Sequence, residues 1–481
     1  MKRWLYLVHR WIGIATCLLL VMWFASGLVM LYVPFPSLDS EERLAGLDPI
    51  AWEQVTQPPV VDTPLRQIAL EMRGDRPVWR LSPWEAAPFS VWADSGEPAG
   101  RAGEAEAQAI AAGFGKAPVT AMWAIHSDQW TVAERYEQHR PLWKAELRGH
   151  NGRVLYVSSR TGEVALDTAQ GERFWNWLGS VPHWLYPRAL REEQPLWRQV
   201  VMWVSGPCIL AAITGIWIGL MRVRAGRKRF KGGRMTPYRG WMKWHHVTGL
   251  VGSAFLLLWI FSGWLSVDPF RLFASDGIGS EALQAYAGET PLPASDLGLL
   301  VQAAPQAHRL VWQSAADRPF LRLQQPGAED RLLAADTLLP LRPDHDRIAE
   351  RSTALVPGVP VAAIDMLARP DAYWYAVRGE AHLPVLRVKF ADEAATWVHI
   401  DPASGNILGE ADAKRRVYRW LFDLFHRWDL NLLLGTPPAR DVLIWLMSIA
   451  GLISSATAVV VGWRRLRRPR KAPSAAIINH S

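Results

Sequence analysis

Residues 11–33 read WIGIATCLLLVMWFASGLVMLYV, a run without a single Asp, Glu, Lys or Arg. A helix that crosses the hydrocarbon core of a bilayer needs about 20 residues of this kind. Three further runs have the same character, at 200–221, 247–267 and 442–463. The sequence therefore predicts a membrane protein with four transmembrane helices.

The start of the first run is similar to a secretory signal peptide. Lys2 and Arg3 precede it, and residues 25–27 are small enough for a cleavage site. However, the apolar run continues to Val33, which is too long for the apolar part of a signal peptide. We therefore expect an uncleaved anchor.

The composition excludes several kinds of site. Of the 481 residues, 50% are hydrophobic and only 20% are charged, and 27 are tryptophan. Both cysteines, Cys17 and Cys208, fall inside predicted membrane helices. The regions outside the membrane therefore have no thiols for a disulfide framework, a zinc site or an iron–sulfur cluster.

Basic residues predict the orientation in the membrane, because they concentrate in cytoplasmic loops. Both termini and the middle loop are therefore expected in the cytoplasm, and the two long regions between the helices outside it. The net charge of +8 is then a signal of topology, and it does not indicate nucleic-acid binding. The unopposed basic residues are Arg222, Arg224, Arg227, Lys228, Arg229, Lys231, Arg234 and Arg239 in the loop, and Arg464, Arg465, Arg467, Arg468, Arg470 and Lys471 in the tail.

The chain is an internal repeat. A shift of 236 residues superposes the first and third apolar runs, and a shift of 243 superposes the ends of the two long regions and the runs that follow them. Both halves start and finish on the same side, so we expect parallel repeats related by a pseudo-two-fold axis along the membrane normal. The matched residues include His9/His245, Gly13/Gly249, Ser26/Ser262 and Gly27/Gly263 at the first shift, and Trp177/Trp420, His183/His426, Ser205/Ser448 and Gly219/Gly462 at the second.

The predicted fold is an α-helical membrane protein, a four-helix bundle made of two tandem helix–α+β region–helix units. Its segments are 1–33 (first span), 34–197 (first exported region), 198–222 (second span), 223–243 (basic loop), 244–267 (third span), 268–440 (second exported region), 441–463 (fourth span) and 464–481 (basic tail).

Within the exported regions, strands are predicted at 153–157 and 396–400. Each runs into a turn, at 160–163 and 402–406, and then into a second short strand. Helices are expected at 104–113 and 294–304. Segments 40–65 and 286–296 are expected to be irregular, since they are rich in proline.

Two pairs of histidines superpose at matched depths. His9 and His245 lie at the cytoplasmic ends of the first and third spans, and His183 and His426 lie on the outer side, shortly before the second and fourth. Two imidazoles that converge from two helices are what a bis-histidine b-type haem requires. Gly13 and Gly249 follow the inner pair by four residues, on the same helix face, where a flat macrocycle could approach the backbone.

The residues also leave alternatives open. Each of the four histidines could instead be an interfacial residue that contacts lipid headgroups. His246 could replace its neighbour His245 as a ligand. Pro182 weakens the assignment of His183, because a proline removes a backbone donor and kinks a helix. The corresponding residue before His426 is Phe425. No Cys-x-x-Cys-His motif is present for covalent haem attachment.

Several other classes of protein find no support. The sequence has no H-E-x-x-H motif, P-loop or nucleophile triad. The cytoplasmic segments are too small for an NAD(P)H or flavin domain, and G-x-G-x-x-G is absent. Electrons would therefore come from a membrane quinol or from a separate cytoplasmic reductant.

The two histidine pairs lie at opposite faces of the membrane. From His9 to Pro34 is about 37 Å of helix at about 1.5 Å per residue, so two haems, one near each face, would together span most of the membrane.

Three stretches resemble the PepSY-associated transmembrane family: residues 7–13 (LVHRWIG), the turn at 161–164 with Trp177 and His183, and residues 424–428 (LFHRW). The resemblance covers essentially the whole chain. It implies PepSY-like periplasmic regions in a bacterial inner-membrane protein, similar to di-haem reductases that release iron from ferric siderophores or other ferric chelates. It also leaves open a haem-free protein that binds or regulates periplasmic partners such as peptidases, and a transporter.

Overall fold

The computed structural model describes residues 2–149, 151–224, 229–293 and 298–467. Within these residues, three helices are long and apolar enough to cross a membrane: α1 (Lys2–Tyr32), α7 (Gln194–Arg222) and α16 (Pro437–Leu466). A fourth candidate is the pair α8 (Trp241–Val251) and α9 (Ser253–Leu265), which is bent by 67°. The protein is a membrane protein, and the predicted count of four holds only if the bent pair is one span.

The bend falls at Gly252, which separates α8 from α9. Gly-Ser pairs are a recognised cause of sharp helix kinks, and Ser253 follows Gly252. The Ser253 hydroxyl donates to the Leu250 carbonyl at 2.7 Å, which stabilises the break. The apolar run continues across this point, so hydropathy alone could not reveal the bend.

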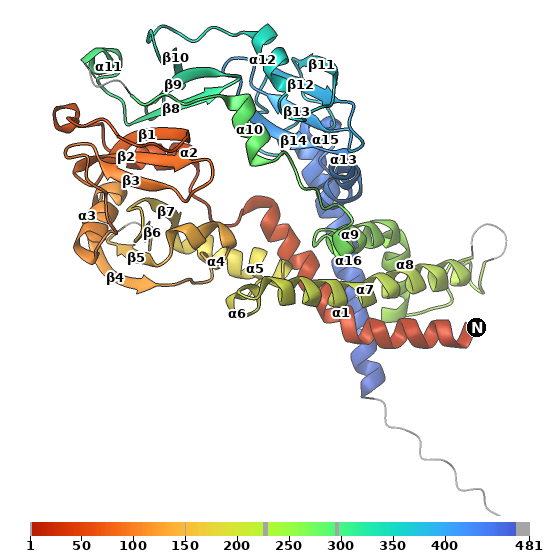
Figure 1. Ribbon diagram of the computed structural model, residues 1–481. Coiled ribbons are helices and arrows are strands. Elements are labelled where there is room, and N and C mark those ends of the chain that lie inside the picture. Colours follow the sequence, from red (N-terminus) through yellow and green to blue (C-terminus); the bar gives the residue numbers. More distant parts are fainter. Residues whose placement is uncertain (1, 150, 225–228, 294–297, 468–481) are drawn as a thin grey trace, which may run out of the picture.

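The long helices pack together as a bundle. α1 contacts both α7 and α16, α8 contacts α16, and α9 contacts α7. In Figure 1 they lie on one side of the molecule and the β-sheets on the other, and the N-terminus lies at the end of α1 away from the sheets. Of the predicted basic segments, residues 225–228 and 468–481 lie outside the described residues.

The two regions between the long helices each contribute three strands and then four. The first three strands of both regions form one six-stranded sheet, in the order β10-β9-β8-β1-β2-β3, and the other two sheets are β4-β5-β6-β7 and β11-β12-β13-β14. The strands are β1 (Leu65–Arg73), β2 (Arg76–Pro83), β3 (Phe89–Trp92), β4 (Val119–Ile125), β5 (Leu142–Leu147), β6 (Val154–Ser158), β7 (Val164–Thr168), β8 (Arg309–Ala315), β9 (Arg318–Gln324), β10 (Arg331–Ala334), β11 (Val361–Leu367), β12 (Val385–Phe390), β13 (Trp397–Ile400) and β14 (Ile407–Ala411).

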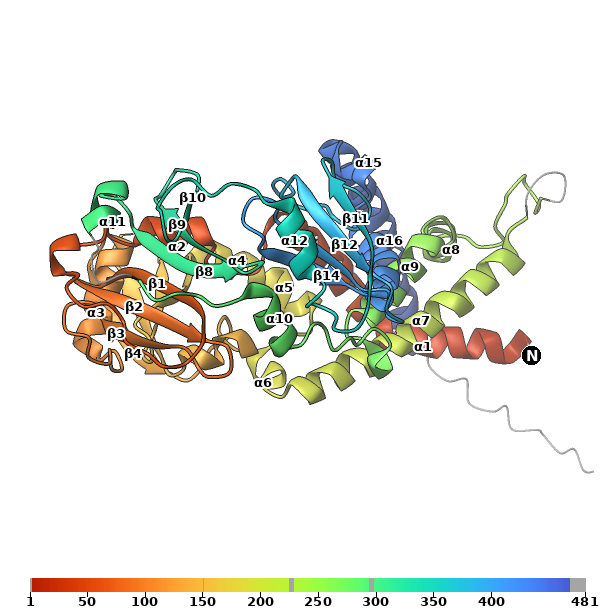
Figure 2. The ribbon, with the colours of Figure 1, turned by 45° about the horizontal axis from the view of Figure 1, so that its top comes forward.

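The shared sheet joins the two halves of the chain. β1 and β8 pair antiparallel, with Ala69 opposite Val311, and Figure 2 shows them side by side. Glu71 on β1 is fully buried and pairs with three guanidinium groups. Burial alone would raise the pKa of Glu71, but these cations outweigh it and hold the pKa far below its usual range. The three cations are Arg43 at 2.9 Å, Arg80 at 2.7 Å and Arg309, from the second half, at 3.1 Å.

Most predicted elements have counterparts. The strands predicted at 153–157 and 396–400 are β6 and β13, and each turn that follows contains a glycine with positive φ, Gly162 at 70° and Gly405 at 81°. Helix α3 (Glu104–Gly115) matches the stretch predicted at 104–113. The helix predicted at 294–304 is α11 (Gly298–Ala303), and residues 294–297 lie outside the described part of the chain.

The prediction of an irregular segment at 40–65 is wrong in part. Helix α2 (Ser40–Gly46) begins there, because Asp39 and Glu42 form a capping box. A short 3₁₀ turn follows at Trp52–Gln54. Further helices are α4 (Gln170–Leu178), α5 (Ser180–His183), α6 (Arg188–Arg191), α10 (Ser280–Ala287), α12 (His345–Ser352), α13 (Ala413–Tyr418), the π-helix η4 (Arg419–Leu424), α14 (Phe425–Arg427) and α15 (Asn431–Leu434).

Candidate functional site

The structure brings the repeat-matched histidines together in two pairs. The ring centres of His9 (α1) and His245 (α8) are 6.3 Å apart with an interplanar angle of 29°. Those of His183 (α5) and His426 (α14) are 6.0 Å apart with an angle of 62°. A ring nitrogen binds a transition metal at about 2 Å, and the ring centre lies about 1 Å further away, so two axial ligands of one iron have centres about 6 Å apart. Both separations therefore suit a bis-histidine haem.

In the first pair, one nitrogen of each ring is held by a backbone carbonyl. His9 Nδ1 lies 3.1 Å from the Ala211 oxygen on α7, and His245 Nδ1 lies 3.1 Å from the Ser454 oxygen on α16. A carbonyl can only accept, so both Nδ1 atoms carry the hydrogen and both Nε2 atoms keep a free lone pair. Metal-binding histidines are usually oriented in this way. Two threonine hydroxyls, of Thr214 at 3.4 Å and Thr457 at 3.5 Å, lie beside the same nitrogens.

In the second pair, serine hydroxyls take this role. Ser26 Oγ lies 3.2 Å from His183 Nδ1, and Ser262 Oγ lies 3.1 Å from His426 Nδ1. Each hydroxyl donates its own hydrogen to a carbonyl within its helix, at 2.7 Å for Ser26 and 3.1 Å for Ser262. Each therefore accepts from the imidazole, which again leaves Nε2 free. The Trp23 carbonyl, at 3.2 Å, is a second acceptor for His183.

The second pair is neutral at physiological pH. Burial lowers the pKa of His183 to about 4 and that of His426 to about 3. Neutral imidazole is the form that binds iron. Within the part of the chain that the structure describes, no hydrogen bond reaches Nε2 of His9, His245, His183 or His426. The donor set therefore fits two bis-histidine haems.

The predicted glycines differ in what surrounds them. A Cβ at Gly13 would meet nothing within 4 Å, whereas one at Gly249 would lie 3.2 Å from Ser454 Oγ. Neither glycine contacts a histidine ring. Gly27 and Gly263 do: a Cβ there would lie 3.1 Å from His183 and 3.3 Å from His426. Of the repeat-matched glycines, Gly27 and Gly263 therefore touch the rings, whereas Gly13 and Gly249 do not.

Gly215 on α7 is a further residue that the sequence did not reveal. A Cβ at this position would lie 2.8 Å from Cε1 of His9. Its counterpart at the shift of 243 is Ala458. Because the repeat does not preserve the glycine, a search for matched residues cannot find it.

The structure distinguishes His245 from its neighbour His246 and shows where Pro182 lies. His246 is buried and turned toward α7, with Nε2 at 3.2 Å from the Gly219 oxygen and its ring 5.3 Å from Tyr238. His245 is the one that faces His9. Pro182 lies in the first turn of the four-residue helix α5, where a missing N–H is tolerated.

A third repeat-matched pair was missed in the sequence. His139 and His382 are also related by the shift of 243. They remain in separate regions, with His139 Nε2 at 3.3 Å from the Gln138 side chain and His382 Nε2 at 3.3 Å from Asp401. Over the described residues, no cluster of three or more His, Cys, Asp or Glu side chains could hold a metal ion. His150 lies outside these residues.

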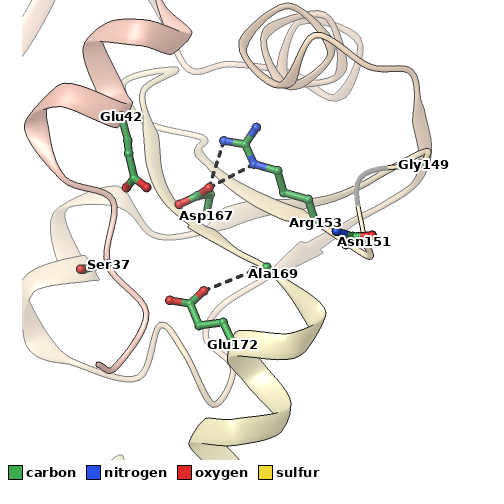
Figure 3. Close-up of a pocket in the computed structure, with 8 residues that line it drawn as sticks. All are labelled: Ser37, Glu42, Gly149, Asn151, Arg153, Asp167, Ala169 and Glu172. Carbon is green, nitrogen blue, oxygen red and sulfur yellow. Dashed lines mark hydrogen bonds and ion pairs between the residues drawn. The ribbon is translucent and has the colours of Figure 1, made fainter. Parts of the chain in front are cut away.

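The pocket drawn in Figure 3, of about 360 Å³, is lined by none of the four histidines. Its carboxylates already have partners. Glu42 and Glu172 accept from the backbone N–H groups of Asp39 and Ala169 at the starts of α2 and α4, both at 3.2 Å. Asp167 pairs with Arg153 at 3.0 Å. The residues around this cavity therefore cap helices and stabilise the sheet region, and we assign no ligand to it.

The comparisons with known proteins identify the family. No curated protein matches the chain. The model of the PepSY-associated TM region matches residues 6–335, which is more than two thirds of the chain. The match includes His9, His183 and His245 and ends before His426. The chain therefore belongs to the PepSY-associated TM family.

Proposed function

We propose that this protein transfers electrons across a bacterial inner membrane through two b-type haems and reduces a ferric compound, a ferric siderophore, in the periplasm. The observation that carries the proposal is the geometry of the two histidine pairs. Each pair has ring centres about 6 Å apart, a fixed Nδ1 and a free Nε2.

His9 and His245 would hold one haem, and His183 and His426 the other. A bound haem would supply one-electron chemistry at its iron. The surrounding residues orient the ligands: carbonyls and threonine hydroxyls at the first pair, serine hydroxyls at the second. Ser26, which contacts His183, follows His9 by 17 residues on α1. At about 1.5 Å per residue this is about 26 Å, close to the thickness of the hydrocarbon core.

The direction of transfer follows from the basic loop and tail. These segments indicate that the termini are cytoplasmic and the sheet regions periplasmic. A quinol or a cytoplasmic reductant would donate electrons near the first pair. A ferric chelate would accept one electron per iron near the second pair, and Fe(III) becomes Fe(II) without a proton transfer.

The alternative is a haem-free membrane protein that binds or regulates periplasmic partners such as peptidases. Membership of the family is compatible with it, and most of the chain lies in the sheet regions. Haem content separates the two proposals. Protein expressed with an ample haem supply should contain two b-type haems per chain in a pyridine haemochrome assay, and a preparation without haem would leave only the alternative.

A second assay tests the substrate. The haem-loaded protein is reconstituted in liposomes with reductant enclosed, and a ferric siderophore with a ferrous chelator is added outside. The expected result is a coloured ferrous complex that forms only with haem-loaded protein. Reduction of the haems without any transfer to the ferric siderophore would contradict the substrate while leaving the haems in place.

A further inference from the structure

Helix α4 has its apolar face on the outside. Phe174 is 57% exposed, and Trp177 and Leu178 are also exposed. By contrast, Asn176 on the opposite face is completely buried, and its amide donates to the Pro34 carbonyl at 2.9 Å. This is the reverse of a surface helix in a water-soluble protein, which turns its apolar stripe inward.

The second half of the chain repeats this reversal. The shift of 243 places Val417 and Trp420 at the positions of Phe174 and Trp177, and both are exposed, Val417 at 50%. Arg419, the counterpart of Asn176, is buried and pairs with Asp429 at 2.9 Å. An inverted arrangement that recurs at the same repeat position reflects the environment of both helices.

Both helices lie where a long helix ends. α4 packs against α1, and Pro34, which accepts from Asn176, follows the end of α1 by two residues. η4 packs against α9, the last helix of the bent pair. In Figure 1, α4 lies between the strands of its sheet region and α1. This is the level at which the chain leaves the hydrocarbon.

We propose that α4 and the segment formed by α13 and η4 are two interfacial helices that lie on the bilayer, at the side of the sheet regions. Their partner is the phospholipid surface. Tryptophan concentrates at this level, because its ring is amphipathic. An apolar face with a charged rim is typical of helices that lie in the interface. Lys414 and Arg415 on α13 are exposed and complement phosphate headgroups.

This placement bears on the second histidine pair. Leu178 precedes His183 by five residues, and Leu421 precedes His426 by five. Each interfacial helix therefore leads directly into one histidine of the pair, whose rings contact α1 and α9 at Ser26 and Ser262.

Spin labels at single cysteines test the proposal. Both native cysteines, Cys17 and Cys208, are buried and would be replaced by alanine. Labels are then attached at Phe174→Cys or Val417→Cys, and the protein is placed in phospholipid bilayers. Collision with oxygen, which concentrates in lipid, is compared with collision with a water-soluble nickel chelate.

Two further positions calibrate the measurement. Leu18→Cys lies on the exposed face of α1, within the membrane, and Ala328→Cys lies in the exposed turn between β9 and β10. We expect labels at 174 and 417 to favour oxygen over nickel several-fold more than the label at 328. Labels that meet nickel as freely as 328 would place the helices in water. Labels shielded from both reagents would show a protein partner or a second copy. Either result overturns the proposal, and neither depends on haem.

Discussion

Gly215→Ala tests whether the His9 ring must keep its position to bind haem. The added methyl carbon would lie 2.8 Å from Cε1 and 3.3 Å from Nδ1 of His9, where ordinary contacts are 3.4–4 Å. The ring must therefore move by about 0.6 Å, roughly three times the tolerance of about 0.2 Å for a metal–ligand distance. A disturbed ligand orientation typically costs about 10- to 100-fold in affinity, or about 1.4–2.7 kcal/mol.

The assay counts haems in two backgrounds. Gly215→Ala alone should lower haem content from two toward one per chain, and in a His426→Ala background it should lower it toward zero. Gly206→Ala is the matched control, because it lies on the same helix and its Cβ would meet nothing within 4 Å. Full haem content in both backgrounds would refute the reasoning. It would show that His9 adjusts to a methyl group at Gly215, the position that Ala458 occupies in the second half.

Two further predictions concern the ligands and the shared sheet. His245→Ala should remove the first haem and keep the second, and His426→Ala should do the reverse; spectra and redox titrations that show both haems in both variants would favour interfacial histidines. Glu71→Gln should destabilise the sheet regions by about 3–5 kcal/mol, since it leaves buried guanidinium groups without their counter-charge; thermal unfolding followed by tryptophan fluorescence measures this. Because the folded pKa of Glu71 is lowered, its contribution is complete above the unfolded pKa of about 4.3 and is lost as pH falls below it. The unfolding temperature of the native protein should therefore fall in acid more steeply than that of Glu71→Gln, and parallel curves would contradict this assignment.

The pairing of the histidine rings could be anticipated, because the duplication keeps His9 in register with His245 and His183 with His426. Their hydrogen-bond partners follow the same register, as Ser26 and Ser262 show. A repeat reveals only what both halves preserve, however. It cannot indicate Gly215, because the counterpart of this residue is Ala458, which carries a methyl group.

Other features depend on contacts that local patterns do not encode. The pairing of Gln67 with Gln313 joins strands that are 246 residues apart, and each strand by itself could have been an edge. The bend at Gly252 interrupts a run that remains apolar throughout. Helix α2 is different, since its capping residues Asp39 and Glu42 are visible in the sequence.

The contacts between the halves have a common organisation. Each histidine pair takes one ring from each half, the six-stranded sheet takes three strands from each, and Glu71 of the first half pairs with Arg309 of the second. A single unit would carry only one histidine of each pair, and its β1 would have an unpaired edge. An open strand edge invites pairing with other chains, so the contact of β1 with β8 protects the sheet of each half. Coordination by two histidines at either pair would therefore require both halves, and under the proposed function a bound haem would link them as the shared sheet does.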